Sequence, residues 1–316
     1  MANFSKESTG ADVVKAFSQN VSGKTIVITG ASAHGIGAQT ALDLAKANPA
    51  HLLLLARSAA KVQPVIDEIA KLSPTIRTSF VSISLDDLES VQSAATEVVS
   101  QLPSGKIDVL INNAGIMAVP FAKTKLGVET QFATNHLGHF VLTQQLTPYI
   151  RAAGKEGRVV NLASDGYLIC PFRPDNINFD DGKSYHPFSA YGQSKTANIL
   201  FTKGLAKRGI TSFAVHPGVI FSTSLAGSLD MSLVDTIDEV AKQNTGQGFT
   251  MGEAKSIEQG VATTIRAAID PEIVKDNGSY MADCQVEDVR GYAKDDELVE
   301  KLWALSEQLV GEKFEI

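Results

Sequence analysis

The chain has 316 residues, of which 44% are hydrophobic and 20% charged, and its net charge is -7. A chain of this length and composition can bury one large core. Proteins that bind nucleic-acid backbones present clustered Lys and Arg, so the acidic balance argues against a nucleic-acid partner.

Neither the cysteines nor the first residues indicate export, and no segment indicates membrane insertion. Cys170 and Cys284 lie far apart, which is typical of reduced thiols in a reducing compartment. The first twenty residues hold no apolar run of signal-peptide length, and the most apolar stretch, His51–Ala56, is too short to span a bilayer. His136 and His139 lack a third metal ligand. We therefore expect a cytoplasmic protein with no membrane span and no metal.

Short apolar runs alternate with helical patterns along most of the chain. The expected strands are Thr25–Thr29, His51–Ala56, Thr78–Ile83, Ile107–Ile111, Arg158–Leu162 and Thr211–Val215. The expected helices are Ala38–Ala47, Val62–Leu72, Leu88–Leu102, Val128–Ile150 and Ala190–Arg208. Strands that are apolar on both faces and alternate with helices are typical of a parallel sheet covered on each side. The pattern predicts an α/β fold with a doubly wound parallel sheet, a Rossmann-type three-layer sandwich that binds ligands at the carboxyl ends of its strands.

The same pattern predicts a single domain with two additions. Residues 1–20 are expected to form an N-terminal arm, and residues 21–316 the Rossmann-fold domain. Within that domain, residues 222–255 are expected to form a small helical lid over the site.

A glycine cluster, Thr29–Gly37, follows the first expected strand and opens the first helix. Gly30, Gly35 and Gly37 let the backbone turn sharply and approach a pyrophosphate, which then lies at the positive end of the helix. In this context the cluster predicts a dinucleotide site, with a glycine-rich turn that binds nothing as the simpler alternative.

The end of the second expected strand bears on the choice of dinucleotide. An acidic residue there would bind the adenosine ribose and repel a 2′-phosphate, but the strand ends in Ala56 followed by Arg57. A guanidinium binds phosphate through paired charge-assisted hydrogen bonds. We therefore predict NADP(H) over NAD(H), and a solvated surface arginine is the alternative.

Tyr191 and Lys195 stand four residues apart in a helical pattern, so they share a face. A fixed positive charge near a phenol stabilises the phenolate and lowers its pKa toward the working pH. This predicts an acid/base pair, although such a pair also occurs in many helices by chance.

The motifs are more specific in combination than singly, because they occur in the same order along the chain as in one known family. In chain order they are Thr29–Gly37, Asn112–Gly115, Asn135, Ser164, Tyr191 with Lys195, and Pro217–Gly218. They resemble the short-chain dehydrogenase/reductase family over about residues 22–290. The segments Asn135–Phe140, Tyr191–Phe201 and Leu302–Glu307 are most similar to its retinol dehydrogenase and carbonyl reductase-like branch.

The resemblance implies a role for each matching residue. Tyr191 exchanges a proton with the substrate oxygen, and Lys195 lowers the tyrosine pKa and binds the nicotinamide ribose. Ser164 polarises the substrate carbonyl, and Asn135 holds a water that relays protons. The implied NADP(H)-binding residues are Gly30, Ser32, Gly35, Ile36, Gly37, Arg57, Ser84, Leu85, Asn113, Ala114, Gly115, Tyr191, Lys195, Pro217, Gly218, Ile220 and Ser222.

The chain departs from the family pattern at several positions. Four residues separate Gly30 from Gly35, where the family has three. Ser164 and Tyr191 are 27 positions apart, so residues 165–187 are expected to form a loop beside the substrate. Two other family positions hold different residues: Ser84 where an aspartate is usual near the adenine, and Ser222, with Thr223 beside it, where a threonine is usual.

The predicted function is NADP(H)-dependent interconversion of a carbonyl and an alcohol on a fairly large apolar small molecule. Large apolar residues in the segments expected around the site either line a substrate pocket or pack these loops down. They are Phe172, Phe179, Phe188, Phe221, Leu225, Met231 and Phe249.

Three further questions stay open. A long-form epimerase or dehydratase would need a larger substrate domain after Pro217. A non-catalytic dinucleotide-sensing regulator would commonly lose Tyr191 or Lys195, and both are present. A homodimer through the helices that carry Asn135 and Tyr191 is one option for the quaternary structure.

Overall fold

An eight-stranded sheet runs through the middle of the molecule in the order β3-β2-β1-β4-β5-β6-β7-β8. In this computed structural model, which describes residues 3–223, 225 and 231–316, β1 to β7 run parallel and β8 pairs antiparallel with β7. The strands are β1 (Thr25–Thr29), β2 (His51–Ala56), β3 (Arg77–Ser82), β4 (Val109–Asn112), β5 (Arg158–Leu162), β6 (Thr211–Val215), β7 (Tyr280–Ala282) and β8 (Gln285–Glu287). The predicted doubly wound parallel sheet is confirmed.

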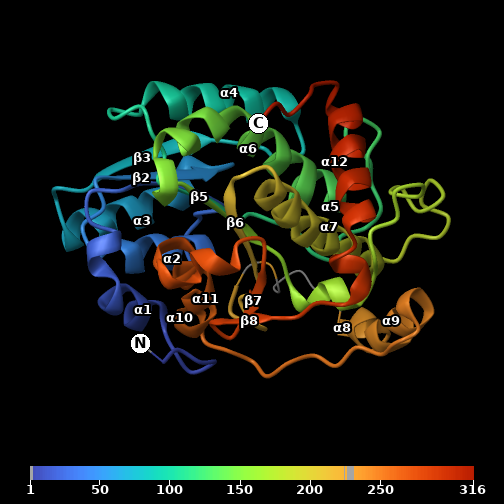
Figure 1. Cartoon of the computed structure of the whole chain (residues 1–316). Helices are drawn as coiled ribbons and strands as arrows, with labels where there is room; N and C mark the ends of the chain where they lie inside the picture. The colour runs from blue at the N-terminus through green and yellow to red at the C-terminus, as the bar shows by residue number, and fades with distance from the viewer. Residues whose placement is uncertain (1–2, 224, 226–230) are drawn as a thin grey trace.

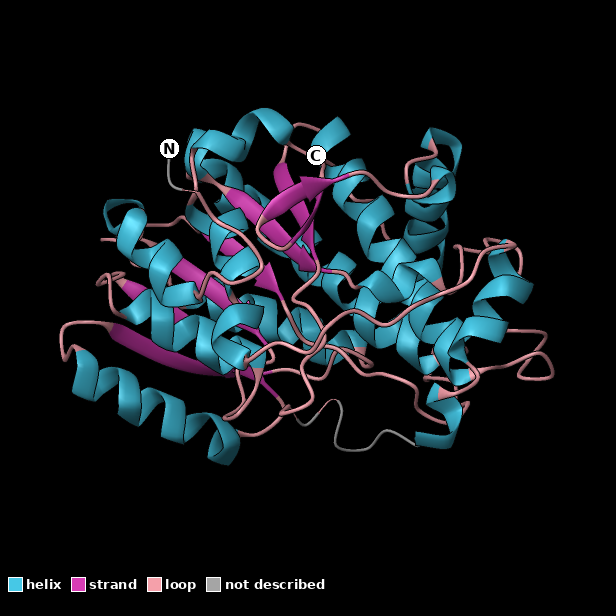
Figure 2. Cartoon of the chain, turned by 90° about the horizontal axis from the view of Figure 1, so that it is seen from below, coloured by secondary structure: helices cyan, strands magenta, loops and turns pink. Residues whose placement is uncertain are grey.

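Helices cover both faces of the sheet, as Figures 1 and 2 show. They are α1 (Gly10–Ala16), α2 (Ile36–Ala45), α3 (Ala59–Leu72), α4 (Leu88–Ser100), α5 (Thr130–Phe132), α6 (Gly138–Ala152), α7 (Pro187–Lys207), α8 (Met231–Val234), α9 (Ile237–Thr245), α10 (Ile257–Gly260), α11 (Ala262–Ile269) and α12 (Asp296–Val310). Helices α1, α2, α3 and α11 contribute to the core on one face, and α4, α6, α7 and α12 to the core on the other.

The central strands are apolar on both sides because each side meets a helical layer. In β1 and β2, Ile26 and Leu52 belong to one buried cluster, whereas Val27 and Leu53 belong to the other. Successive side chains of a strand point to opposite faces, so both clusters draw on the same strands. Each fully buried Leu or Ile stabilises the fold by about 1.5–3 kcal/mol.

The strand order reverses at β1, which pairs with β2 on one side and β4 on the other. The crossovers that follow these strands leave in opposite directions, and a crevice therefore forms at their carboxyl ends. This topology places the glycine cluster after β1 and Asn113 after β4 next to each other.

The last two strands, β7 and β8, were not predicted. Each has three residues, and a two-residue turn joins them, with Asp283 and Cys284 at φ +50° and +60°. Two positive φ angles are typical of the tight turns that match the twist of a hairpin. Neither the short strands nor the Asp-Cys turn gives a recognisable sequence pattern.

Residues 3–20, expected to form an N-terminal arm, contain α1. Thr9 and Asp12 cap α1 with reciprocal hydrogen bonds, and Val13 and Val14 are buried between α1 and the body of the protein. Figure 1 shows α1 beside α10 and α11. A helix of seven residues has too few turns for its periodicity to stand out in the sequence.

The lid expected over residues 222–255 contains α8 and α9, and its residues 224 and 226–230 lie outside the described residues. Ile237 and Val240 of α9 pack with Phe188 at the start of α7. The lid therefore rests on the helix that carries Tyr191.

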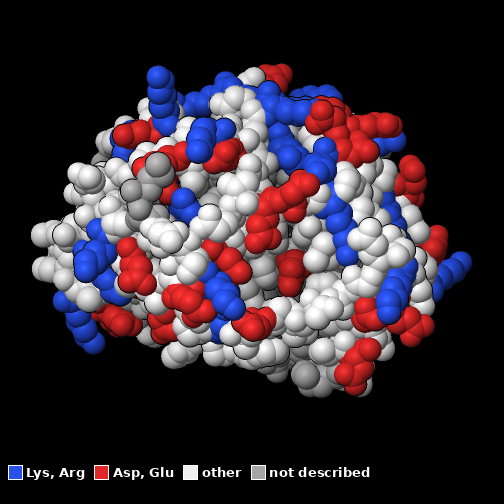
Figure 3. Space-filling model, turned by 60° about the horizontal axis from the view of Figure 1, so that its bottom comes forward, with Lys and Arg blue, Asp and Glu red and all other residues white. Residues whose placement is uncertain are grey.

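Within the described ranges, no helix has the length and apolar character needed to cross a membrane. Nor does any group of three or more His, Cys, Asp or Glu among these residues have an arrangement that could hold a metal ion. Acidic and basic side chains are interspersed on the face that Figure 3 shows.

Candidate active site

A groove of about 640 Å³ opens at the carboxyl ends of the strands on both sides of the reversal point. Its volume is typical of sites for small molecules and cofactors. It brings together most of the residues predicted to bind the dinucleotide: Gly30, Ser32, Gly35, Ile36, Arg57, Leu85, Asn113, Ala114, Gly115, Tyr191, Lys195 and Pro217.

The glycine cluster needs its glycines for two different physical reasons. Gly30 has φ +71°, and a Cβ there would lie 2.8 Å from the Cα of Ala114. Gly37 is buried behind the loop, where a Cβ would lie 2.6 Å from the carbonyl oxygen of Gly30. The additional loop residue is accommodated by His34, an exposed residue with φ +64°.

A buried hydrogen-bond chain connects this loop to the helix that carries Asn135. The Thr29 hydroxyl accepts from the backbone N–H groups of Asn113 (2.9 Å) and Ala114 (3.0 Å), and it lies 2.9 Å from His139 Nε2. His139 Nδ1 lies 3.1 Å from the carbonyl oxygen of Asn135. Because a carbonyl only accepts, Nδ1 carries the proton and Nε2 accepts from Thr29. Burial lowers the pKa of His139 to about 4, which keeps the ring neutral at neutral pH.

At the adenosine end of the groove, Arg57 is exposed and lines the groove wall. It makes no hydrogen bond or ion pair with any described residue, so its guanidinium is free to bind a ligand. Ser84 does not line the groove, because its hydroxyl donates to the Asp86 carboxylate over 2.6 Å. Asp86 lines the groove there instead. Of the two residues predicted near the adenine, Leu85 lines the groove and Ser84 does not.

The nicotinamide end of the groove contains Tyr191 and Lys195, which lie on one face of α7 and are both buried. Lys195 Nζ donates to the Leu162 carbonyl over 2.9 Å and lies 5.5 Å from the centre of the Tyr191 ring. A Cβ on Gly115 would lie 3.6 Å from this Nζ. The missing side chain therefore keeps Lys195 accessible from the groove.

Asn135 lies in a π-helical turn, Ala133–Leu137, just before α6. Such turns interrupt helices frequently at functional sites. Its amide group donates to the Ile116 carbonyl (2.9 Å) and to the Ser194 hydroxyl (2.9 Å), and it accepts from the Ile116 N–H (2.8 Å). The side chain thus joins the loop after β4 to α7, one residue from Lys195.

Burial is the main influence on the acid/base pair. It raises the pKa of Tyr191 above the ordinary value of 10, and a hydrogen bond with Ser164 opposes part of this rise. Burial also lowers the pKa of Lys195 to about 8. The sequence argument expected Lys195 to lower the tyrosine pKa, but in this geometry desolvation is the largest influence on that pKa and raises it. The phenol is consequently protonated at neutral pH and ready to act as an acid.

A second cavity, of about 120 Å³, adjoins the groove and is mainly apolar. Tyr191 lines both spaces, and Ser164 lines the second. Of the large apolar residues considered for a substrate pocket, Phe188, Phe221, Leu225 and Phe249 line this cavity. The cavity also contains two polar side chains, Asp165 and His216.

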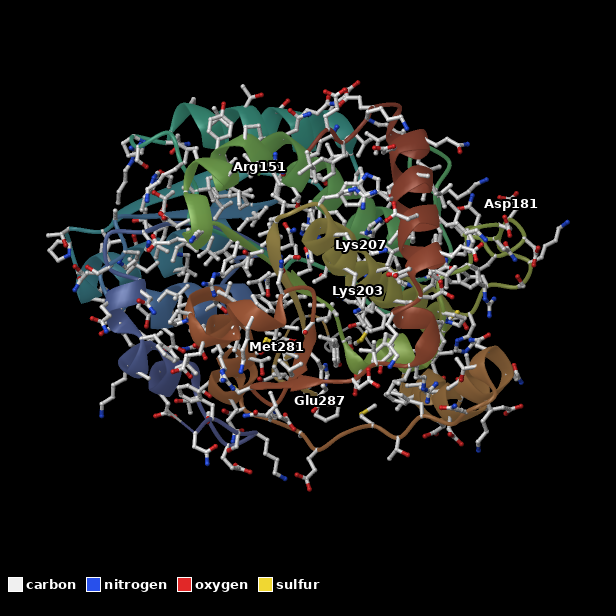
Figure 4. The ribbon with its side chains drawn as sticks, in the orientation of Figure 1. Arg151, Asp181, Lys203, Lys207, Met281 and Glu287 are labelled. Atoms are coloured by element: carbon white, nitrogen blue, oxygen red, sulfur yellow. The ribbon has the colours of Figure 1, made fainter. Side chains whose placement is uncertain are left out.

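The other large apolar residues do not line this cavity. Phe172 stacks on Phe132 with ring centres 6.0 Å apart, and Phe179 packs against Tyr185. These contacts hold down the loop between β5 and α7, whose outer part carries Asp181 (Figure 4). The side chain of Met231 lies outside the described residues.

The segment after β6 supplies the remaining predicted contacts unevenly. Gly218 and Ile220 line the apolar cavity rather than the dinucleotide groove. Ser222 is exposed and lines neither space, whereas Thr223 is buried and lines both. Of these two hydroxyl residues, only Thr223, which the sequence offered as the alternative to Ser222, lines the groove beside Tyr191 and Lys195.

Sequence reasoning did not place Asp165 and His216 in the cavity or His139 beside Thr29. His216 bonds to Asp165, 51 positions away, and His139 bonds to Thr29, 110 positions away. The bond between Asp165 and Ser164 joins neighbours in one turn. No local sequence pattern marks any of these contacts. Asp165 directly follows Ser164 and His216 directly precedes Pro217, and this adjacency to two motifs was the available signal.

Comparisons with known proteins identify the family of the chain. The family described as "short chain dehydrogenase" matches residues 24–169. Retinol dehydrogenase 12 of Mus musculus is 34% identical over 299 residues, which cover 93% of this chain and 89% of that protein. Short-chain dehydrogenase TIC 32 A, chloroplastic, of Brassica napus is 34% identical over 306 residues, which cover 90% and 88%.

Solved structures share the fold. A crystal structure of an uncharacterized protein from Mycobacterium paratuberculosis has a TM-score of 0.67 and 30% identity, covering 93% of this chain and 96% of that one. NADPH-bound carbonyl reductase from chicken fatty liver has a TM-score of 0.59 and 21% identity, covering 85% and 100%. From its fold, its site and these relatives, the chain belongs to the short-chain dehydrogenase/reductase family, in its retinol dehydrogenase-like branch.

Proposed function

We propose that this chain interconverts a carbonyl and an alcohol on a fairly large apolar small molecule, with NADP(H) as its cofactor. The observation that supports this most directly is the position of Tyr191, which lines both the dinucleotide groove and the apolar cavity. A proton donor at that junction serves an oxygen atom that enters from one side while a cofactor lies on the other.

The residues of the site divide the chemistry as follows. A bound nicotinamide supplies or accepts the hydride. Tyr191, protonated at neutral pH, donates its proton to the oxygen of the developing alkoxide and takes it back in the reverse direction. Ser164 donates a hydrogen bond to the same oxygen, and Lys195 binds the nicotinamide ribose. The carbonyl of Asn135 holds a water through which Tyr191 and Lys195 exchange protons with solvent.

NADP(H) is the proposed cofactor because Arg57 is exposed, unpaired among the described residues and placed at the adenosine end of the groove. A guanidinium binds a 2′-phosphate through charge-assisted hydrogen bonds, whereas a ribose diol offers it no charge. The glycine cluster and the start of α2 bind the pyrophosphate. Because NAD(H) and NADP(H) both contain this group, the contact does not distinguish between them.

The relatives support an apolar alcohol or aldehyde as substrate class, since several are named retinol dehydrogenases. The second cavity, of about 120 Å³, is mainly apolar and suits the part of such a molecule next to its carbonyl or alcohol group. A cytoplasmic location is proposed from the sequence features alone, and two relatives are named as chloroplastic.

A non-catalytic dinucleotide sensor is the second candidate. It would need a groove but no proton donor beside an apolar cavity. Here Ser164, Tyr191, Lys195 and Asn135 are all present and converge, which favours catalysis.

The experiment is an assay of NADPH oxidation, followed by absorbance, against a panel of aromatic, terpenoid and aliphatic carbonyls. Turnover of apolar ketones or aldehydes with NADPH, and much slower turnover with NADH, is the expected result. NADPH binding without turnover of any carbonyl, or of the corresponding alcohols with NADP, would instead support the sensor.

A further inference from the structure

Asp165 and His216 place a polar pair in a cavity whose lining is mainly apolar. Asp165 begins the short 3-10 helix η4 (Asp165–Leu168), and His216 follows the last residue of β6. Both side chains line the cavity, and they are 24% and 12% exposed. The walls around them include Ile169, Phe188 and Ile237.

The hydrogen bonds of the pair leave one oxygen atom free. Asp165 Oδ1 accepts from the Ser164 hydroxyl over 3.0 Å, and the Asp165 N–H donates to His216 Nδ1 over 3.2 Å. Because Nδ1 accepts, the proton of the neutral ring is on Nε2, which is 3.7 Å from Asp165 Oδ2. Oδ2 is in ion-pair range of this ring nitrogen but has no hydrogen bond with a described residue, so it can accept one from a ligand in the cavity.

The bond between Ser164 and Asp165 conflicts with the role of Ser164 in the reaction. A serine hydroxyl has one hydrogen, which here goes to the carboxylate, while its oxygen accepts from the Gly166 N–H over 3.0 Å. To polarise a substrate carbonyl, Ser164 must turn this hydrogen away from Asp165. The carboxylate then loses this donor at the edge of the cavity, where a hydroxyl of the substrate can replace it.

Resting on the function proposed above, we propose that Asp165 is a specificity-determining residue and that the substrate carries a hydroxyl group close to its carbonyl. The substrate hydroxyl donates to the Asp165 carboxylate as the Ser164 hydroxyl turns to the carbonyl oxygen. The two acceptors lie within one hydrogen-bond length of Ser164, so an α- or β-hydroxyketone presents its oxygens at a suitable spacing. His216 holds the backbone of Asp165 in place. A neutral hydroxyl fits better than an ammonium group, because the apolar walls would strip water from a cation.

The test compares two ketones that differ by one hydroxyl, benzoin and deoxybenzoin, as substrates with NADPH. The measured quantity is the ratio of their kcat/KM values in the wild type, in Asp165→Leu and in Asp165→Asn. Comparing ratios between proteins removes the intrinsic difference in ketone reactivity. Asp175→Leu, at an exposed position in the same loop, is the matched control.

We expect the wild type to prefer benzoin, and Asp165→Leu to lower that preference about 10- to 100-fold, the range for a hydrogen bond to a charged group. In this variant kcat/KM for deoxybenzoin should fall much less than kcat/KM for benzoin, and the affinity for NADPH should stay near that of the wild type. Asp165→Asn keeps the shape of the side chain and one acceptor oxygen, so its preference for benzoin should lie between those of the wild type and Asp165→Leu. The preference of Asp175→Leu should match that of the wild type.

An equal loss on both ketones, or an unchanged ratio, would overturn the inference, since Asp165 would then only support the fold or Ser164. If Asp165→Leu does not fold, the ratio in Asp165→Asn decides, and an unchanged ratio there has the same meaning. Reduction of both ketones without preference rejects this inference alone. A failure to turn over any carbonyl or alcohol with NADP(H) rejects the proposed function itself.

Discussion

At the scale of single residues, the site depends on desolvation. Tyr191 and Lys195 are 7% and 4% exposed, so each is pushed toward its neutral form. A neutral phenol can donate a proton, and a lysine with a pKa of about 8 exchanges its proton near physiological pH. This arrangement is a cost for the fold, because a buried ammonium is poorly solvated.

The first residue-scale prediction concerns stability. The pKa of Lys195 falls from 10.5 to about 8, so the folded chain binds fewer protons than the unfolded chain between these pH values. The penalty is complete below pH 8, on the order of 3 kcal/mol, and it disappears as the pH rises toward 10.5. Lys195→Met should therefore raise the free energy of unfolding at pH 7, because Asn198 still donates to the Leu162 carbonyl.

Denaturant unfolding of Lys195→Met and wild type across pH 7 to 10 measures this effect. The advantage of the variant should shrink as the pH rises. Lys71→Met, at an exposed position in α3, is the control and should change little. A Lys195→Met protein less stable than wild type at pH 7 would show that the ammonium is well solvated or paired.

The second residue-scale prediction concerns Arg57. Arg57→Asp removes the guanidinium and adds a repelling charge, so the dissociation constant for NADPH should rise about 10- to 100-fold or more, with little change for NADH. Arg77→Asp, exposed at the opposite end of the strands, is the matched control. Fluorescence titration with both dinucleotides measures the effect, and an unchanged preference contradicts the choice of NADP(H).

At the scale of elements, close packing shapes the groove. The turn after β1 fits only because Gly30 and Gly37 approach neighbouring backbone without a side chain. Gly37→Ala should destabilise the fold by about 1–3 kcal/mol and reduce the thermal stabilisation that NADPH gives. Gly252→Ala, where a Cβ meets nothing within 4 Å, is the control. The measurement is the melting temperature of each variant with and without NADPH. Equal melting temperatures and equal NADPH-induced shifts in Gly37→Ala and Gly252→Ala would mean that the turn tolerates a methyl group.

Elements with a strong periodic pattern could be predicted, and those formed by distant contacts could not. Strands such as β1 and β2 are apolar on both faces, so their place in a covered parallel sheet follows from sequence. The short hairpin of β7 and β8 has no such pattern. Motif order located Tyr191, Lys195 and Ser164, but the pairing of Asp165 with His216 depends on how β6 lies beside β5. Side-chain contacts between neighbouring strands leave no periodic trace in either segment.

At the scale of the whole molecule, the helix that carries Tyr191 is enclosed. α12 packs along α7, where Trp303 lies against Gly204 and stacks on Phe314. Lys207 at the end of α7 pairs with Asp296 of α12 over 2.8 Å, and Figure 4 shows Lys203 and Lys207 beside that helix. The face through which a homodimer was considered is thus covered by the chain itself.

We therefore expect a monomer. Sedimentation equilibrium should give a mass near 33.6 kDa, independent of concentration in the micromolar range. Twice that mass would contradict the expectation. It would require α12 to leave α7 or a second interface to exist elsewhere on the surface.

The central claim is that Tyr191 donates the proton that accompanies hydride transfer. The most direct measurement is single-turnover reduction of a carbonyl substrate by 4-deuterated NADPH, with deuterium in the alcohol product counted by mass spectrometry, in wild type and Tyr191→Phe. The wild type should deliver deuterium to the alcohol carbon. Tyr191→Phe should bind NADPH with similar affinity but form product at least 100-fold more slowly, within the range for loss of a positioned acid. Deuterium transfer by Tyr191→Phe at the wild-type rate would contradict the account.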